Sequence, residues 1–553
     1  MNLKKRSDRE AEGCSVTVGI PVPGFLGRGE RIYHLLELDS QAMALFTLEA
    51  SGFRGVLTIL DPMDRRVRGW MIDSDGKRSL AFVADMAGKY RLQLQSELGT
   101  GNYQLTLEQT LSLEERVSAA PDSRLESPRI KQLRADLATH PSQALAVFWR
   151  EVEREGTPLL EDDPLEPRLT LCTFLWRGDE QTRNVRVHLL FRTMLPNDYT
   201  MAWLEGTDLW YTTIQLPSQG RFAYTLLVNV PPIAPPDIDS APRHKLIYFA
   251  SSKTDPLNRQ PCLEEPGGRF ESLSSLVLPG APPQPWMDER LGVSRGALQR
   301  VTMKSELLQD ERFISAYTPP GYSTEAKPYG LLLVFDEQWY LSRVPTPTIL
   351  DNLLADGKIP PLVAIVIGNG PGDARSRQLP CNPLFADFMA TELIPWAQRH
   401  YNVTNDPSRT IIAGSSYGGL ASTYVALHYP ERFGNVLSQS GSYWWQPSEQ
   451  LEQFNEPNRS RQGNHIAGLF IQRPKLALRF YLDAGTGEIA LTGTGRSILV
   501  ANRHLRDVLL AKGYEVHYQE FIGGHDFLSW RGTLADGLIA LTSSWDGTSP
   551  PML

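Results

Sequence analysis

Residues 411–422, IIAGSSYGGLAS, contain the clearest candidate for chemistry in the chain. The five residues 414–418 fit the pattern G-x-S-x-G, in which a serine is exposed on a sharp turn from a strand into a helix. An apolar strand-like run, TIIA, precedes the pattern, and the helix-like GLASTYVALHY follows it. Glycines on both sides remove side chains that would collide in such a turn. We therefore predict that Ser416 is a nucleophile and that Ser415 supports the turn.

A base must accept the proton of this serine, because a free hydroxyl is a weak nucleophile. In hydrolases with this type of turn the histidine follows the serine and the acid in the chain. His525 fits, because it follows the strand-like EVHYQEF in a glycine loop, GGHDFLSW. The other downstream histidines lie in helical, polar-loop or strand contexts that favour structural roles: His428, His465, His504 and His517. We predict that His525 is the base.

The acid that orients the histidine is expected in the loop DAGTGE, after the apolar strand LALRFYL. Two carboxylates qualify. Asp483 is still close to the strand end, where it can cap or brace the loop. Glu488 lies further out, where it can reach a histidine on a neighbouring loop. We favour Glu488 and keep Asp483 as the alternative.

Acyl transfer also needs donors for the oxyanion of the tetrahedral intermediate, each contributing about 10²–10³ in rate. The backbone N–H of Tyr417 directly follows the nucleophile. A second donor is expected from an earlier strand-end loop, and VFDEQW after YGLLL has the right place. We favour the backbone N–H of Gln338.

The elements that must position these residues change character along the chain. In residues 290–553 short apolar runs such as YGLLLVFD, LVAIVIGNG and TIIAGSS each stop at a polar or glycine loop, and helical patterns lie between them. Strands buried on both faces and alternating with helices indicate a mainly parallel sheet. In such sheets the loops at the carboxyl ends of the strands carry the chemistry. We expect an α/β-hydrolase domain here.

Alternating apolar and polar runs earlier in the chain predict two β-domains, so the expected fold is multidomain, all-β plus α/β. Residues 1–115 are predicted to form a β jelly-roll that resembles bacterial pre-peptidase C-terminal domains, which are usually accessory. Residues 158–285 are predicted to form a β-sandwich that ends in an irregular Pro- and Gly-rich linker, residues 256–290. The helical connector, 125–157, begins at Ser127-Pro128, which is typical of a helix start.

Composition and charge exclude several classes of protein. The chain has 553 residues, 41% of them hydrophobic, which is enough for several buried cores. Its net charge of −8 gives no footprint for nucleic acid. No run approaches the roughly 18 apolar residues of a membrane span. The absence of a clean signal peptide at the N-terminus favours the cytoplasm.

The four cysteines are too widely spaced for a CxxC redox pair or a zinc knuckle, and too few for a disulfide scaffold. They are Cys14, Cys172, Cys262 and Cys381. We predict that all four are free thiols and that the protein has no metal site or cofactor of its own.

Several strings together resemble the enterochelin (enterobactin) esterases, which hydrolyse ferric catecholate trilactone siderophores. They are LLVFDEQWY, RSRQLPCN at 375–382, AGSSYGG, ALHYPERFGNVLSQSGSYWW at 426–445 and GGHDFLSWRG at 523–532. TFLWRGD near Thr173 and DPLN at Asp255 resemble the N-terminal β-domain of that family. The resemblance covers about residues 140–550.

This resemblance implies roles for individual residues. Ser416 and His525 correspond to the nucleophile and base, and DAGTGE matches the acid loop, which supports Glu488. Arg375 matches the arginine of an RxxELPCN-like loop, but Gln378 stands where that pattern has glutamate, which puts the pocket geometry in question.

An iron(III) tris-catecholate is anionic and presents flat aromatic faces, so its pocket should offer guanidinium groups and aromatic walls. The iron belongs to the substrate. Side chains of both kinds lie in or near the active-loop strings, and some of these aromatic residues are expected to be packing residues instead. The candidates for substrate binding are Arg375, Arg377, Trp339, Tyr443, Trp444, Trp445 and Trp530.

We therefore expect a serine esterase that cuts the trilactone of ferric enterobactin-like siderophores, so that iron can be released inside the cell. Alternatives are a feruloyl or carbohydrate esterase of the same superfamily and a siderophore-binding protein without catalysis. The first β-domain resembles modules common on exported proteins, so the periplasm is the alternative location. The sequence does not indicate an oligomeric state.

Overall fold

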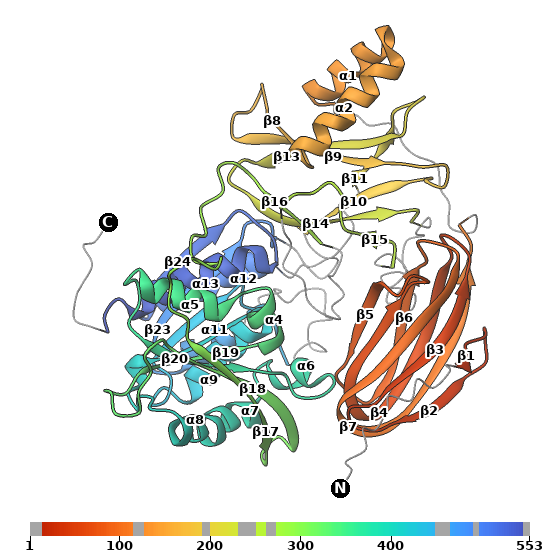
Figure 1. Cartoon of the computed structure of the whole chain (residues 1–553). Helices are drawn as coiled ribbons and strands as arrows, with labels where there is room; N and C mark the ends of the chain where they lie inside the picture. Colours follow the sequence, from red (N-terminus) through yellow and green to blue (C-terminus); the bar gives the residue numbers. More distant parts are fainter. Residues whose placement is uncertain are drawn as a thin grey trace, which may run out of the picture. The chain divides into compact units, whose positions relative to one another are not determined.

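The computed structural model describes residues 14–113, 126–190, 199–230, 250–260, 273–447, 465–489 and 497–545. The chain forms two compact units. One comprises Met1–His188, Asn197–Leu216 and Tyr224–Leu276, and the other Leu189–Pro196, Pro217–Ala223 and Val277–Leu553. The expected mixed α/β fold with several sheets is confirmed (Figure 1). The four predicted segments are finer than this division into two units, and they stay a prediction.

Residues 14–113 form one seven-stranded sheet that encloses its own hydrophobic core. Its strands are β1 (Cys14–Ser15), β2 (Val22–Leu26), β3 (Arg31–Leu38), β4 (Met43–Leu60), β5 (Arg66–Ile72), β6 (Gly76–Val83) and β7 (Gly88–Leu111). The sequence pattern predicts more and shorter strands than the structure has. The reason is that β4 and β7 each join two of the alternating apolar and polar runs. The two paired strands are irregular at Gly52 and Gly99. A Cβ on Gly52 would lie 2.7 Å from the oxygen of Thr100. Because glycine has no side chain, the two backbones can come this close, and each long strand can bend without ending.

The helical connector is present as two helices, α1 (Pro128–Thr139) and α2 (Pro141–Glu155). The Ser127 side chain accepts a hydrogen bond from the N–H of Ile130, and Pro128 occupies the first helical position. The predicted helix start is thus confirmed. Ile130 and Leu133 are buried, as the apolar face of the first helix requires.

The remaining strands of the first unit form a five-stranded and a four-stranded sheet within the described residues. They are β8 (Leu159–Asp162), β9 (Leu169–Arg177), β10 (Val185–Leu189), β11 (Tyr199–Thr200), β12 (Ala202–Trp203), β13 (Leu209–Pro217), β14 (Arg221–Val228), β15 (Ser252–Lys253) and β16 (Ser274–Val277). β16 pairs with β14 and lies inside the segment predicted as an irregular linker. Its four residues are too few to show a strand period.

The second unit is built on an eight-stranded sheet with the order β17-β18-β20-β19-β21-β22-β23-β24. β17 (Ala297–Ser305) and β18 (Asp310–Thr318) are antiparallel to their neighbours. The other six run parallel, as the apolar runs predict: β19 (Gly330–Phe335), β20 (Leu362–Ile367), β21 (Thr410–Ser415), β22 (Asn435–Gln439), β23 (Arg479–Gly485) and β24 (Glu515–Phe521).

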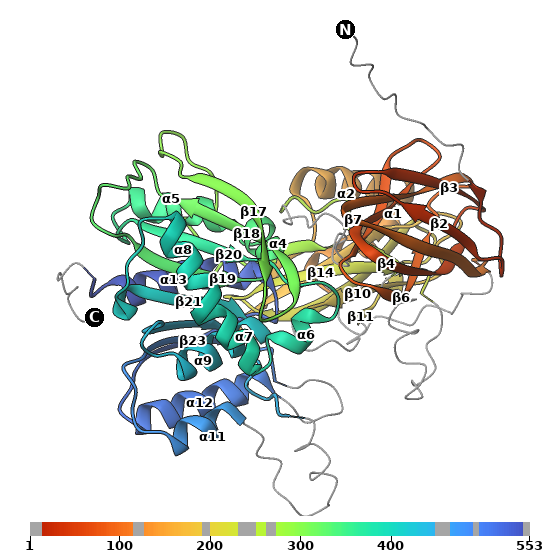
Figure 2. The same ribbon diagram turned by 90° about the horizontal axis from the view of Figure 1, so that it is seen from below.

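Helices cover both faces of this sheet (Figure 2). They are α4 (Glu337–Ser342), α5 (Thr346–Ala355), α6 (Ala374–Gln378), α7 (Pro383–Asp387), the π-helix η2 (Phe388–Leu393), α8 (Ile394–His400), the short 3₁₀-helix η3 (Pro407–Arg409), α9 (Tyr417–His428), α11 (His465–Gln472), α12 (Ile498–Ala511) and α13 (Phe527–Thr542). Helices α9, α11 and α12 pack on one face, and α5 and α13 on the other.

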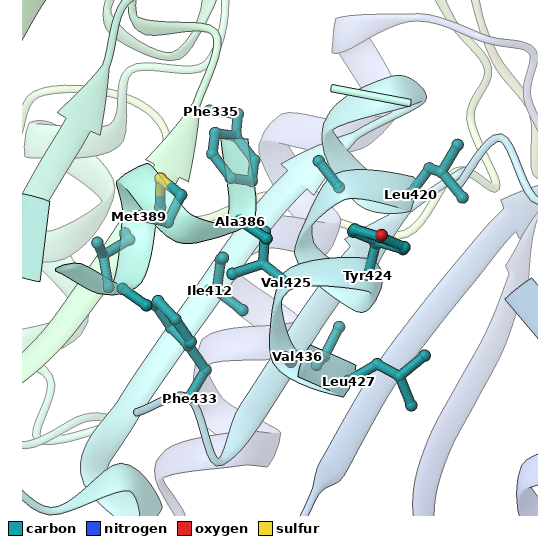
Figure 3. Packing of buried hydrophobic residues seen from close by; sticks show 14 of the residues in the cluster. Phe335, Ala386, Met389, Ile412, Leu420, Tyr424, Val425, Leu427, Phe433 and Val436 are labelled. Atoms are coloured by element: carbon teal, nitrogen blue, oxygen red, sulfur yellow. The ribbon is translucent and has the colours of Figure 1, made fainter. Parts of the chain in front are cut away.

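Successive residues of β19 point to opposite faces, which explains the continuous apolar run. Leu331 and Leu333 belong to the core beneath α9, while Leu332 and Val334 belong to the core beneath α13. Figure 3 shows the first of these cores around Ile412. A strand with two buried faces can be apolar throughout.

Of the four cysteines, Cys14, Cys172 and Cys381 are free thiols, as predicted. Cys262 lies outside the described residues. No helix among those residues is long and apolar enough to cross a membrane.

Substitution of Ile412 on β21 measures how much this core contributes to the stability of the protein. It is fully buried, so Ile412→Ala should destabilise the protein by about 2–5 kcal/mol through lost burial and an unfilled cavity. Urea denaturation measures the loss. Ile471→Ala, the same change at a side chain that is 58% exposed, is the control and should shift stability by less than about 0.5 kcal/mol. Equal shifts for the two variants would contradict the packing described.

Candidate active site

Ser416 lies on the sharp turn between β21 and α9. Its backbone has φ 56° and ψ −119°, a conformation that non-glycine residues rarely adopt. The turn brings the backbone of Gly414 against that of Gly418, and a Cβ on Gly414 would lie 2.8 Å from the carbonyl carbon of Gly418. Gly414 is therefore required by close backbone approach, whereas a Cβ on Gly418 would lie 3.3 Å from the Cβ of Phe335. The strand, turn and helix have the order that the sequence predicts.

Hydrogen bonds hold Ser416 in this strained position. Its N–H donates to the oxygen of Gln439 at the end of β22 (2.9 Å), and its own carbonyl accepts from the N–H of Ser442 (3.0 Å). The Ser416 hydroxyl lies 3.2 Å from the hydroxyl of Ser442. The neighbouring strand end therefore offsets the conformational cost of presenting this serine.

His525 and Glu488 form a close pair at the same edge of the sheet. The Nδ1 atom of His525 lies 2.5 Å from Oε1 of Glu488. The second carboxylate oxygen accepts the N–H of Gly485 at 2.7 Å, and the Glu488 side chain is almost completely buried. Because Nδ1 is engaged, Nε2 of His525 is the ring nitrogen left for proton transfer.

The third contact of a catalytic triad is open in this structure. Among the hydrogen bonds of the described residues, none joins the Ser416 hydroxyl to His525. The hydroxyl contacts Ser442 instead. Such bonds are often long or misaligned in unliganded enzymes and tighten when substrate binds.

Asp483, the alternative acid, has a different environment. It is fully buried on β23, and its Oδ1 accepts the N–H of Ser440 at 2.8 Å. Burial, reinforced by the nearby charge of Glu488, raises the pKa of Asp483 to about 8. A carboxyl that is largely protonated at neutral pH braces the loop rather than stabilising a cationic imidazole.

Asp526, next to His525, also lies in a buried position. It accepts the N–H of Ser529 at 3.2 Å and begins α13. Burial raises the pKa of this carboxyl to about 7. Its place in the structure is that of a helix cap beside the histidine.

Of the other downstream histidines, three lie in the settings that the sequence indicates, while His465 begins α11 rather than lying in a polar loop. His428 bonds through Nδ1 to the oxygen of Tyr424 (2.9 Å), and burial lowers its pKa. His465 packs its ring against Trp445, His504 lies within α12, and His517 lies on β24 beside a glutamate.

Tyr417 and Gln338 both stand in the first turns of helices that begin at strand ends. Tyr417 opens α9, and Gln338 lies in the first turn of α4, after β19. In α4 the N–H groups of Trp339 and Tyr340 already donate to the oxygen of Asp336. The N–H of Gln338 precedes these bonds and so is unused within the helix.

Arg375 is paired with a carboxylate rather than free. Its Nε and Nη2 donate to the two oxygens of Asp336 at 2.7 and 2.8 Å, and Asn369 donates to the same carboxylate at 2.8 Å. Burial opposes the charge, but Asp336 outweighs it and the pKa of Arg375 is raised. The guanidinium also lies over the rings of Trp339 (5.0 Å) and Tyr417 (5.8 Å).

Two other residues of α6, Arg377 and Gln378, have partners of their own. Arg377 is exposed and pairs with Asp373. Gln378, which replaces a glutamate of the family pattern, is buried and does not meet the Arg375 pair. It donates to Asp310 (2.6 Å) and accepts from Arg312 (3.0 Å). Because Asp310 already balances the charge of Arg312, a neutral side chain fits there.

The predicted aromatic contacts divide into two groups. Tyr443 is fully buried, with its hydroxyl bonded to Ser438 and Thr423, and Trp530 is 2% exposed. Direct substrate contact is therefore wrong for these two in this structure, because neither presents a surface. Trp530 instead packs edge-on against the ring of His525 at 4.8 Å. Trp339, Trp444 and Trp445 are partly exposed.

Two residues that contact this site were missed by the sequence analysis. Asp336 is in the left-handed region, φ 65°, at the end of β19, and Ser442 follows β22. Their positions at strand ends were a usable signal, because the carboxyl ends of parallel strands meet at one edge. No spacing rule links residue 442 to residue 416.

Within the described part of the chain, no group of three or more His, Cys, Asp or Glu side chains could hold a metal ion.

The buried Asp483 carboxyl predicts a pH effect on stability. Its pKa is raised in the folded state from 3.8 to about 8, so the folded state holds this proton more tightly than the unfolded chain. Its contribution is complete below about pH 4 and is lost as pH rises toward about 8. Asp483→Asn keeps a neutral side chain of similar shape, so its unfolding midpoint should fall less than that of wild type between about pH 5 and pH 8.

The measurement is thermal unfolding at both pH values, with Asp288→Asn, a change at an exposed aspartate, as the matched control. The control should follow wild type. Parallel falls for wild type and Asp483→Asn would show that this carboxyl does not hold its proton in the folded state.

Comparisons with known proteins identify relatives in sequence and fold. The Esterase family matches residues 305–541, and the family described as enterochelin esterase, N-terminal, matches residues 171–287. Iron(III) enterobactin esterase of Dickeya dadantii is 32% identical over 434 residues, which cover 73% of this chain and 94% of that protein.

Two solved structures have a similar fold. The enterobactin esterase of Shigella flexneri, crystallised in the presence of enterobactin, has a TM-score of 0.58 at 30% identity and covers 71% of this chain and 97% of its own. The ferric enterobactin esterase of Salmonella typhimurium has a TM-score of 0.60 at 28% identity, over 73% of this chain and 100% of its own. From its sequence, its fold and the residues gathered at the sheet edge, this chain belongs to the enterobactin esterase family.

Proposed function

We propose that this chain is a serine esterase that hydrolyses the ester bonds of the trilactone in ferric enterobactin-like siderophores. The observation that carries the proposal is the strained turn at Ser416, φ 56° and ψ −119°, at the same sheet edge as the His525–Glu488 pair. Family membership supports the substrate, because relatives that this chain matches over 94% and 95% of their own length are named iron(III) enterobactin esterase.

The proposed reaction begins when the Ser416 hydroxyl attacks a lactone carbonyl and its proton passes to Nε2 of His525. Glu488 holds the imidazole in the required tautomer and stabilises its charged form. His525 then returns the proton to the leaving hydroxyl. Water, activated by the same histidine, releases the acyl group from Ser416.

The oxyanion is proposed to accept hydrogen bonds from the N–H groups of Tyr417 and Gln338. Both lie in the first turn of a helix, where backbone N–H groups come before the hydrogen bonds within the helix and the helix dipole favours negative charge. Preorganised donors of this kind do not have to reorient when the charge develops.

The proposed substrate surface combines aromatic faces with balanced cations. Arg375 contacts the rings of Trp339 and Tyr417 while Asp336 neutralises part of its charge, so it offers a flat surface more than a free positive charge. Arg377 is the more exposed cation of the two. Trp444 and Trp445 are proposed as further contacts for catechol rings. Action in the cytoplasm, with the periplasm as alternative, stays a prediction.

The nucleophile is tested by Ser416→Ala with iron-loaded enterobactin as substrate and mass spectrometry of the products. We expect wild type to linearise and cleave the trilactone, and the variant to lose at least about 10³-fold in kcat. Wild-type rates in the variant would contradict covalent catalysis at this serine. Cleavage of methyl ferulate by a wild-type enzyme that leaves ferric enterobactin intact would favour the feruloyl esterase alternative.

The acid is tested by comparing Glu488→Gln with Asp483→Asn. In Glu488→Gln the neutral amide no longer stabilises a charged imidazole. Its N–H either faces Nδ1 of His525, which favours the wrong tautomer, or faces the N–H of Gly485, which loses that bond. We expect kcat to fall about 10²–10⁴-fold with little change in KM. Asp483→Asn should retain most of kcat. The reverse ranking, in folded variants, would assign the acid to Asp483.

A further inference from the structure

A second serine hydroxyl lies against the nucleophile. Ser442 reaches Ser416 through two contacts: its N–H donates to the carbonyl of Ser416 at 3.0 Å, and the two hydroxyl oxygens are 3.2 Å apart. The Ser442 side chain is only 1% exposed. Among the described residues, Ser416 is the hydrogen-bond partner that the structure assigns to this hydroxyl.

The loop that carries Ser442 is fixed on several sides. The N–H of Ser440, in a left-handed conformation with φ 47°, donates to Asp483, and Asn502 of α12 donates to the carbonyl of Gly441 at 2.8 Å. A Cβ on Gly441 would lie 2.6 Å from the hydroxyl of Ser438, so only glycine fits. A loop held in this way presents Ser442 without further ordering when the reaction begins.

If Ser442 only stabilised the turn at Ser416, its backbone contact would be sufficient. The N–H of Ser442 already bonds to the carbonyl of Ser416, so any residue at position 442 would supply that bond. The hydroxyl adds a second contact, in which either oxygen can donate, and so it supplies one O–H that can turn to the reacting oxygen once Ser416 gives up its proton. A hydrogen bond to an oxygen that becomes negative is stronger than one to a neutral hydroxyl.

We propose that Ser442 is a catalytic residue of the acylation step, donating its O–H to the Ser416 oxygen as that oxygen attacks. The Ser416 proton moves to Nε2 of His525, the new C–O bond forms on Ser416, and Ser442 keeps its own proton throughout. In the free enzyme the same contact holds the Ser416 hydroxyl in place. This rests on the proposed role of Ser416 as nucleophile.

The test is Ser442→Ala in the full chain, which removes one buried oxygen and keeps the backbone bond. We expect kcat for ferric enterobactin to fall about 10- to 100-fold, with KM within about twofold, since the lost bond is made to a developing charge. The rate at which a fluorophosphonate probe labels Ser416 should fall by a similar factor. Ser422→Ala, the same change in a buried serine that donates to Gly418 within α9, is the control and should stay within about twofold of wild type.

Ser442→Cys separates hydrogen bonding from shape, because cysteine fills a similar space with a much weaker donor. We expect it to behave closer to the alanine variant than to wild type. Wild-type activity in Ser442→Cys would assign a steric role and overturn the proposal.

Unchanged or faster turnover in Ser442→Ala would also overturn the proposed role of Ser442. Faster turnover would mean that the contact restrains the nucleophile. Ser416→Ala keeps the two proposals distinguishable. If Ser416→Ala remains active and labelled, the proposed function fails. If Ser416→Ala is inactive while Ser442→Ala matches wild type, only the role of Ser442 fails.

Discussion

The turn at Ser416 is the constraint on which the rest of the site depends. A non-glycine residue with φ 56° persists only when its surroundings favour that conformation over relaxed ones. Here the N–H of Ser416 is bonded to Gln439 and its carbonyl to Ser442, both from the end of β22. The side-chain oxygen and nitrogen of Gln439 bond in turn to Tyr340 of α4 and Trp530 of α13. The strain is therefore supported by the neighbouring strand end and by two helices that share one core.

Charge pairing is the second feature of this sheet edge. The carboxylate of Asp336 is matched by Arg375, and that of Asp310 by Arg312, with Gln378 as a neutral partner. Asp483 avoids charge through its raised pKa. In a buried region each uncompensated charge would cost several kcal/mol, so pairing or protonation is the available solution. The Glu488 carboxylate accepts the N–H of Gly485 with one oxygen and lies beside Nδ1 of His525 with the other.

The parts of the site that sequence reasoning predicted are those with local causes. The G-x-S-x-G motif needs glycine at position 414 because of close approach to the backbone of Gly418, and that contact arises within five residues. Strands with two buried faces were visible as continuous apolar runs, as in β19. The bends in β4 and the short β16 were not visible, because a strand period does not mark a bend and four residues do not establish a period.

The sequence by itself determined the strand–turn–helix order around Ser416, and it placed Glu488 and His525 in later loops that follow strands, since each of these depends on patterns local in the chain. Only the tertiary structure decided which carboxyl meets the histidine, that Arg375 is paired with Asp336, and that Tyr443 and Trp530 are buried. The contact between Ser416 and Ser442 belongs to the same group. These outcomes depend on which strand ends become neighbours in the sheet, and that is set by long-range packing over both faces rather than by any local pattern.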